Sequence, residues 1–213
     1  YLEETIQNLI QSDKIGNAKV YKTLLIGMKT FLKNKDIPLK DVKYDFIKKF
    51  ESAYLSRNNS VNGLSVYLRT LRSLINKAIK EKILDKENYP FEDYKIKTIQ
   101  TSKRSISIDA IKRIIDLKLA KQDPLYETRN FFLASFYMMG ISFIDLVSLK
   151  MENIIDGRIK YIRRKTHKPY DVKISENLWL ILAEYTKGKK KHDYIFPVIK
   201  SDTPQDQYRD IVW

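Results

Sequence analysis

Residues 158–174 read Arg158-Ile-Lys-Tyr-Ile-Arg-Arg-Lys-Thr-His-Lys-Pro-Tyr-Asp-Val-Lys-Ile174, and this stretch predicts a β-hairpin. Two runs rich in β-branched and aromatic residues, 159–163 and 170–174, flank a polar turn at residues 165–169. Pro169 has no backbone N–H group, so it fits the turn or the edge of a sheet. The pattern therefore places a short antiparallel sheet within a chain that is otherwise helical.

The tip of the predicted hairpin concentrates positive charge. Side chains alternate along a strand, so Arg163 and Lys165 should share one face if the strand persists, while Arg164 points the other way. His167 and Lys168 lie in the same turn. This charge exceeds what stability requires and suits contact with a phosphate backbone. The alternative is a solvated hairpin whose charges only keep its edge strand from pairing with other chains.

Composition favours a polyanionic partner. Among 213 residues, 40 Lys and Arg outnumber 26 Asp and Glu, which gives a formal charge of +14 and an isoelectric point near 9.6. Nucleic acid or an anionic membrane surface would match such a charge. No apolar run reaches the roughly 18 residues of a membrane span. The chain starts at Tyr1 without a signal-peptide pattern, so we expect a cytoplasmic piece of a longer protein.

The sequence predicts neither a metal site nor a cofactor. It contains no cysteine, which excludes disulfides and thiolate ligands. Its two histidines, His167 and His192, lack the clustering that a zinc site needs.

Helical periodicity accounts for most of the chain outside the hairpin. The apolar residues of 124–139 occur on nearly all sides, so we expect this helix to be central and buried. The apolar residues of the predicted helix 107–119 are also available for burial. The predicted helices are 2–10, 17–32, 44–55, 60–84, 107–119, 124–139, 142–149 and 175–186. The expected fold class is mainly α with a small β-sheet.

The longest predicted helix, 60–84, carries a polar flank beside its apolar stripe. At 100° per residue, five polar residues fall in one narrow sector, which suits contact with phosphates and groove edges. They are Ser65, Arg69, Arg72, Asn76 and Lys80. The alternative is a face that serves only solubility.

Three segments follow from these patterns. Residues 1–94 form an all-helical basic module, 95–104 a polar linker, and 105–213 a second domain. Lys103 and Arg104 close the linker and are predicted to lie along a polyanion. A plain solvated tether would explain their charge as well.

Several segments, in this order, resemble the tyrosine recombinase (phage integrase) family, and look most similar to the integrases of Bacteroides-type mobile elements. In the second half these are Phe136-Tyr-Met-Met-Gly-Ile-Ser-Phe-Ile-Asp-Leu-Val-Ser-Leu149, the hairpin with Arg-Arg-Lys165-Thr, and Tyr194-Ile-Phe-Pro197. In the first half they are Ile15-Gly-Asn-Ala-Lys-Val-Tyr21, Tyr67-Leu-Arg-Thr-Leu-Arg72, Asn76-Lys-Ala-Ile79 and Tyr89-Pro-Phe91.

The resemblance implies a helical SAM-like core-binding domain followed by a partial α+β catalytic domain. Together they would clamp duplex DNA, with multimers assembling on paired recombination sites. In the family a tyrosine attacks the scissile phosphate, arginines stabilise the transition state, and a hairpin lysine protonates the leaving 5′ oxygen. That lysine matches Lys165. The implied function is site-specific DNA recombination during integration of a mobile element, without a cofactor, by a cytoplasmic, nucleoid-associated protein.

The first catalytic arginine of the family is missing. Its usual position, two residues after Gly140, holds Ser142 here, and the position used by some relatives holds Met139. We hypothesise that Arg163 substitutes for it, with Arg164 as the fallback. A contact of Arg163 with a backbone phosphate alone is the competing interpretation.

The later motifs of the family are also missing from these 213 residues. Neither histidine is followed three residues later by arginine, and Tyr208 lacks the sequence context of the nucleophile. The chain is therefore predicted to bind DNA without cleaving it. A non-catalytic regulatory or excision factor on the same fold is the main alternative. An RNA-binding or membrane-surface protein would explain the charge but not the order of the motifs.

Overall fold

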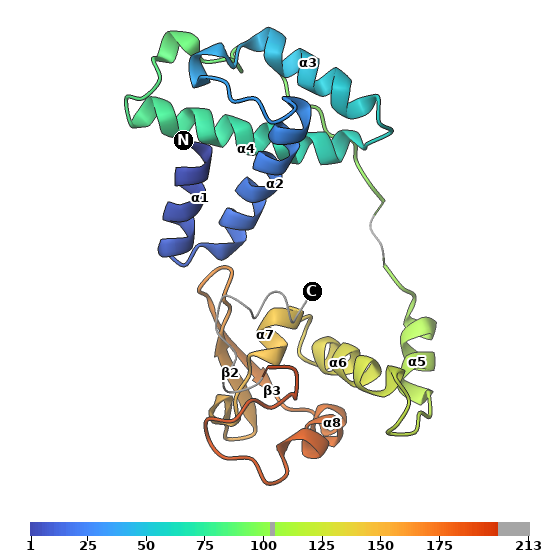
Figure 1. The fold of residues 1–213 in the computed structure, drawn as a ribbon. Coiled ribbons are helices and arrows are strands. Elements are labelled where there is room, and N and C mark those ends of the chain that lie inside the picture. The colour runs from blue at the N-terminus through green and yellow to red at the C-terminus, as the bar shows by residue number, and fades with distance from the viewer. Residues whose placement is uncertain (103–104, 200–213) are drawn as a thin grey trace. The chain divides into compact units, whose positions relative to one another are not determined.

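The computed structural model describes residues 1–102 and 105–199. It divides the chain into two compact units, residues 1–103 and 104–213 (Figure 1). Helices dominate both units, and one three-stranded antiparallel sheet lies in the second. The predicted fold class, mainly α with a small β-sheet, is confirmed.

Four helices build the first unit around one apolar core. They are α1 (Leu2–Gln11), α2 (Ile15–Phe31), α3 (Tyr44–Leu55) and α4 (Val61–Lys80), with 3₁₀ turns η1 (Leu39–Asp41) and η2 (Lys86–Asn88). Leu24, Ile47, Leu68 and Ile75 are almost completely buried, as the periodicity of their helices predicts.

Helix α4 begins and ends at defined signals. Ser60 caps its start, since the Ser60 hydroxyl accepts the Gly63 N–H at 3.0 Å. The helix ends at Lys80 rather than at the predicted residue 84. Lys82 adopts a left-handed φ of 58°, and the Ile83 N–H reaches back to the Ala78 carbonyl at 2.9 Å. This is a Schellman motif, which terminates a helix.

The predicted linker is partly attached to the first unit. Residues 95–102 form neither helix nor strand. The Asn62 amide at the start of α4 nevertheless donates to the Ile99 carbonyl and accepts the Ile99 N–H, each at 2.8 Å. The beginning of this segment therefore follows the surface of the first unit.

The second unit packs helices against the hairpin. Its helices are α5 (Ile108–Asp116), α6 (Leu125–Tyr137), α7 (Phe143–Val147), η3 (Met151–Asn153) and α8 (Glu176–Thr186). Its strands are β1 (Ile154–Ile155), β2 (Arg158–Ile162) and β3 (Pro169–Lys173), hydrogen-bonded in the order β1-β2-β3. Ile162 pairs with Pro169, so the proline opens an edge strand.

A late segment of the chain completes the core of the second unit. Residues 193–196 run beside 149–151, where the Ile195 N–H donates to the Leu149 carbonyl at 2.8 Å. Ile195 and Phe196 are fully buried. The Lys189 ammonium donates to two carbonyls of this segment, each at 2.8 Å, and its burial lowers the pKa of Lys189. This lysine, in the loop after α8, is thus structural.

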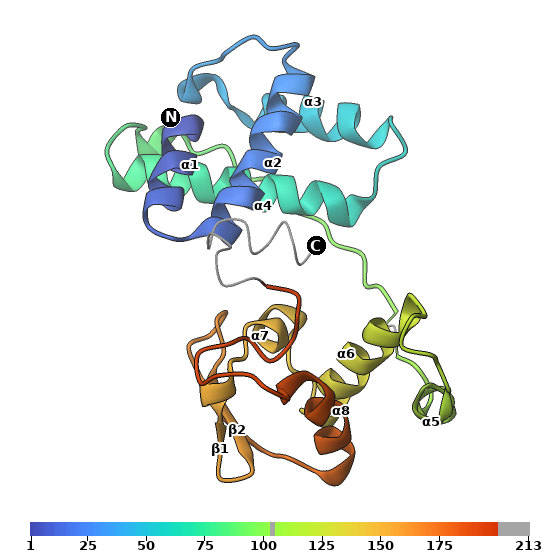
Figure 2. The same ribbon diagram turned by 60° about the horizontal axis from the view of Figure 1, so that its bottom comes forward.

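Two predictions of burial are wrong. Helix α6 lies beside α8 (Figure 2) and packs on α7 and α8, but Phe132 and Phe136 are 37% and 44% exposed. Helix α5 has no buried residue, and Ile108 is 72% exposed. The sequence shows which faces of a helix are apolar. How many of these faces are buried depends on which neighbouring elements pack against the helix.

Candidate nucleic-acid interface

The hairpin tip spans residues 163–168 and is closed by its own backbone. The Arg163 N–H donates to the Lys168 carbonyl at 2.9 Å, and the His167 N–H donates to the Arg163 carbonyl at 2.8 Å. His167 adopts a left-handed φ of 54°. The tip is therefore an ordered turn, and it exposes Lys165, His167 and Lys168 together.

The predicted shared face of Arg163 and Lys165 does not form. Strand β2 ends at Ile162, so both residues lie in the turn, where side chains no longer alternate. The Arg163 guanidinium lies 3.5 Å from the hydroxyl of Tyr170 on the same hairpin. Strand geometry therefore does not link Arg163 to Lys165.

Asp145 ties the hairpin tip to helix α7. Its carboxylate is buried, with 4% of the residue exposed. Oδ1 accepts the Arg164 N–H at 3.0 Å, and Oδ2 accepts the Ser142 hydroxyl at 2.5 Å. Ser142 in turn caps α7. Sequence reasoning missed Asp145, although a serine followed three residues later by an acid is a helix-start signal.

Arg164 is bonded through Asp145 to Ser142, the position at which the resemblance suggested an arginine. Its backbone N–H is bonded to the same carboxylate as Ser142. Its guanidinium Nη1 lies 3.3 Å from the Ser148 hydroxyl. Met139, the other position that the resemblance suggested for this arginine, is 87% exposed and left-handed with φ of 58°.

Arg164 and Ser148 line a polar cavity of about 310 Å³ together with Lys150 and Asn153. The Asn153 side chain accepts the Lys150 N–H and donates to the Lys160 carbonyl. The Lys150 ammonium lies 5.4 Å from the ring centroid of Tyr194. The carboxylate of Asp145 also lines this cavity, so Arg164 and Lys150 leave one net positive charge there for an anion. Sequence reasoning missed Lys150 because no local pattern marks it.

The carboxylate of Asp145 also influences the aromatic wall of this region. Burial raises the pKa of Tyr161, and the negative charge of Asp145 raises it further. The Tyr161 ring stacks on Tyr170 of β3, with centroids 5.2 Å apart. The phenol therefore remains a neutral part of the hairpin at physiological pH.

The flank of α4 presents a second cationic surface. Arg72, Asn76 and Lys80 are exposed, and among the described residues their side chains make no hydrogen bond or ion pair. Arg69 folds back, so that Nη2 donates to the Ser65 hydroxyl at 2.8 Å and Nε to the Ser65 carbonyl at 3.1 Å. Ser65 is 1% exposed. Its observed role is to orient Arg69, and a direct DNA contact from Ser65 stays a prediction.

Some predicted site residues cannot be placed. Lys103 and Arg104 lie outside the described residues, as does Tyr208. Within the described residues, no group of three or more His, Asp or Glu side chains could hold a metal ion. None of the helices in residues 1–102 and 105–199 has both the length and the apolar composition that a bilayer crossing needs.

Comparison of sequences identifies the first unit. The family model of the phage integrase SAM-like domain matches residues 1–97. No curated protein sequence matches the chain. The likeness to integrases of Bacteroides-type elements stays a prediction.

Comparison of folds covers both units. A lambda integrase dimer bound to a COC′ core site matches with a TM-score of 0.61 at 16% identity, over 79% of this chain and 60% of that chain. A lambda integrase tetramer bound to a Holliday junction matches with a TM-score of 0.63 at 17% identity, over 86% of this chain and 55% of that chain. The Tn1549 transposon integrase in complex with a circular intermediate DNA matches with a TM-score of 0.57 at 12% identity, over 89% of this chain and 66% of that chain.

The chain spans less than two thirds of the length of each of these three solved chains. At such low identity the likeness concerns the fold alone. Residues 1–97 thus match the phage integrase SAM-like domain, and the chain shares its fold with the solved integrases.

Proposed function

We propose that the chain binds duplex DNA as part of a site-specific tyrosine recombinase that integrates a mobile element in the cytoplasm. Each unit supplies a cationic surface, the flank of α4 in the first and the hairpin tip with its polar cavity in the second. Relatives of the same fold have been solved on a core site, a Holliday junction and a circular intermediate. A multimer on paired sites is part of the proposal.

The observation that carries this proposal is the attachment of the hairpin tip. A solvated hairpin would need no internal anchor, yet a buried carboxylate holds the Arg164 amide at 3.0 Å. This anchor fixes the backbone next to Lys165 while leaving the Lys165 side chain exposed. A general acid needs such positioning, because it must lie within hydrogen-bond reach of the leaving oxygen.

The geometry favours Arg164 over Arg163 as the substitute for the missing arginine. Arg164 lines the cavity that also holds Lys150, and its backbone shares a carboxylate with Ser142. We infer that a DNA phosphate enters this cavity. Arg164 and Lys150 would balance its charge, and Lys165 would protonate the 5′ oxygen that leaves when a tyrosine attacks the phosphorus.

Salt-dependent binding tests the proposal. Fluorescence anisotropy with labelled duplex DNA should show log K falling linearly with log salt concentration. Arg72→Ala and Lys80→Ala should each weaken binding to all sequences and reduce the slope by about one unit. Lys22→Ala is the matched control, because this exposed lysine lies on α2. An altered sequence preference at an unchanged slope would contradict a phosphate contact.

The second unit has its own test. Arg164→Ala should weaken binding more than Arg163→Ala, because only Arg164 lines the polar cavity. Equal losses would remove the argument for Arg164. Preference for RNA over duplex DNA of equal length, in the same salt series, would instead favour an RNA-binding protein.

A test of DNA cleavage distinguishes a recombinase from a non-catalytic DNA-binding factor. These 213 residues should form no covalent adduct with a pre-cleaved suicide substrate, and an adduct would overturn this prediction. The missing arginine equally suits a non-catalytic regulatory or excision factor. A longer form of the protein that contains the later family motifs and still forms no adduct would favour that alternative.

A further inference from the structure

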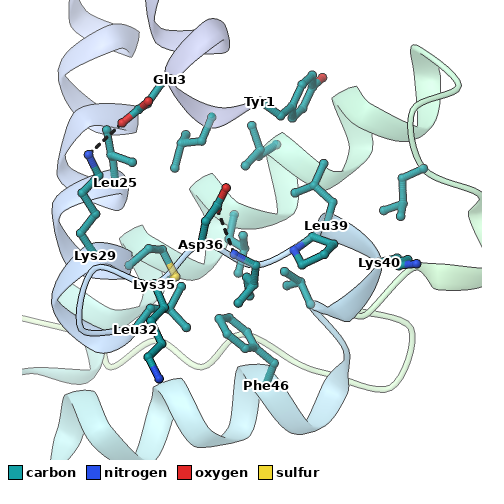
Figure 3. A pocket seen from close by; sticks show the side chains of 18 of the residues that line it. Tyr1, Glu3, Leu25, Lys29, Leu32, Lys35, Asp36, Leu39, Lys40 and Phe46 are labelled. Carbon is teal, nitrogen blue, oxygen red and sulfur yellow. Dashed lines mark hydrogen bonds and ion pairs between the residues drawn. The ribbon is translucent and has the colours of Figure 1, made fainter.

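A cavity of about 670 Å³ lies in the first unit, apart from the α4 flank. It is located where α1, α2, α3 and the end of α4 converge, and the loop between α2 and α3 passes in front of it (Figure 3). Aliphatic and aromatic side chains form most of its wall, including Leu25, Leu32, Leu39, Phe46 and Leu74. Mainly apolar walls with a few polar groups are typical of small-molecule sites of this size.

The polar groups around the cavity leave a net positive charge. Glu3 and Lys29 form an ion pair of 2.8 Å and balance each other. Asp36 accepts the N–H of the next residue at 2.9 Å. Lys35 and Lys40 are exposed and, among the described residues, have no hydrogen bond or ion pair. The two lysines are therefore available to an anion.

The wall and the loop are part of the folded first unit. Met28 and Val42, which line the cavity, belong to the buried core. The loop leaves α2 through two left-handed residues, Lys33 and Asn34, with φ of 53° and 60°. The Asn34 N–H donates to the Lys29 carbonyl at 2.8 Å and closes a Schellman motif. The start of the loop is therefore fixed by a defined helix-ending motif.

We propose that this cavity binds an amphipathic anion, a small molecule with an aliphatic or aromatic body and one carboxylate or sulfonate group. The apolar body would fill the space among Leu25, Leu39 and Phe46. The anionic group would pair with Lys35 or Lys40 at the mouth. An apolar cation of the same size would meet like charge there and bind more weakly.

Titration calorimetry with decanoate and decyltrimethylammonium tests this proposal at about 0.15 M salt, where distant surface charges are screened. One decanoate should bind per chain, at least about 10-fold more tightly than the cation, a preference worth about 1.4 kcal/mol. Equal affinities, or uptake of several molecules without saturation, would overturn the proposal.

Two variants separate the cavity from the overall charge of the chain. Lys35→Glu with Lys40→Glu should abolish the preference for decanoate, whereas Lys22→Glu with Lys43→Glu, which changes the net charge equally, should preserve it. Similar losses in both pairs would refute a local site. Leu39→Trp should fill the cavity and prevent decanoate from binding. If that variant does not fold, the comparison of the two double lysine variants tests the site. DNA plays no part in these measurements, so their outcome is independent of the proposed function.

Discussion

Replacing Asp145 should release the hairpin tip and destabilise the second unit. The buried carboxylate accepts the Arg164 N–H at 3.0 Å and the Ser142 hydroxyl at 2.5 Å. A hydrogen bond to a charged group contributes about 1.5–3 kcal/mol. The Arg164 amide lies near the surface and can bind water once it is freed. We therefore expect Asp145→Ala to lower the free energy of unfolding by about 2–4 kcal/mol.

Tryptophan fluorescence during urea unfolding can measure this change in one unit. Trp179 lies in α8 of the second unit and residues 1–103 contain no tryptophan, so the signal does not report on the first unit. Asp145→Asn is the matched variant, because it preserves the size of the side chain and one acceptor oxygen. It should cost less than Asp145→Ala.

Hydrogen exchange at the Arg164 amide provides the decisive observation. If the carboxylate anchors the tip, exchange of this amide should become faster in Asp145→Ala than the change in global stability explains. DNA affinity should fall as well, because Lys165 and Arg164 lose their fixed positions. Unchanged exchange, together with an unfolding free energy within about 0.5 kcal/mol of wild type, would refute the anchor.

Three further outcomes are expected. Lys189→Met should lower the stability of the second unit by about 1–3 kcal/mol, because two carbonyls lose their donor; urea unfolding of exposed Lys191→Met is the control. Met139→Gly should raise stability by about 0.5–1 kcal/mol because φ is 58° there, while Met139→Arg should stay within about 0.5 kcal/mol in thermal melts. Burial and the Glu81 hydrogen bond raise the pKa of Tyr1 to about 12. Since the unfolded pKa is near 10, the stability that Tyr1 contributes should be lost as pH rises from about 10 to 12, and circular dichroism of Glu81→Gln should show a smaller loss.

Local pattern was sufficient for most of the secondary structure. Helix α3 has the predicted bounds, Tyr44–Leu55, and the strands of the hairpin pair as their β-branched residues indicate. Caps, apolar spacing and turn residues act within a few positions of one another, so they can be recognised in the sequence. The exposed cations of α4 and of the hairpin tip could be predicted for the same reason.

Contacts between distant residues could not be predicted in this way. Asp145 and Arg164 are separated by 19 positions, and neither residue type alone indicates that they meet. The assignment of Arg163 relied on a strand that ends one residue earlier, at Ile162. Likewise, the buried position of Ser65 and its bond to Arg69 depend on how α4 docks in its unit.

The sequence by itself determined the elements of this protein, its positive charge and the order of its integrase-like motifs, because these follow from residue type and short-range spacing. Only the tertiary structure decided which cation stands beside Ser142, which faces of α5 and α6 stay exposed, and where a cavity remains. Those features arise from packing between segments far apart in the chain, where a small shift in docking changes which side chains meet.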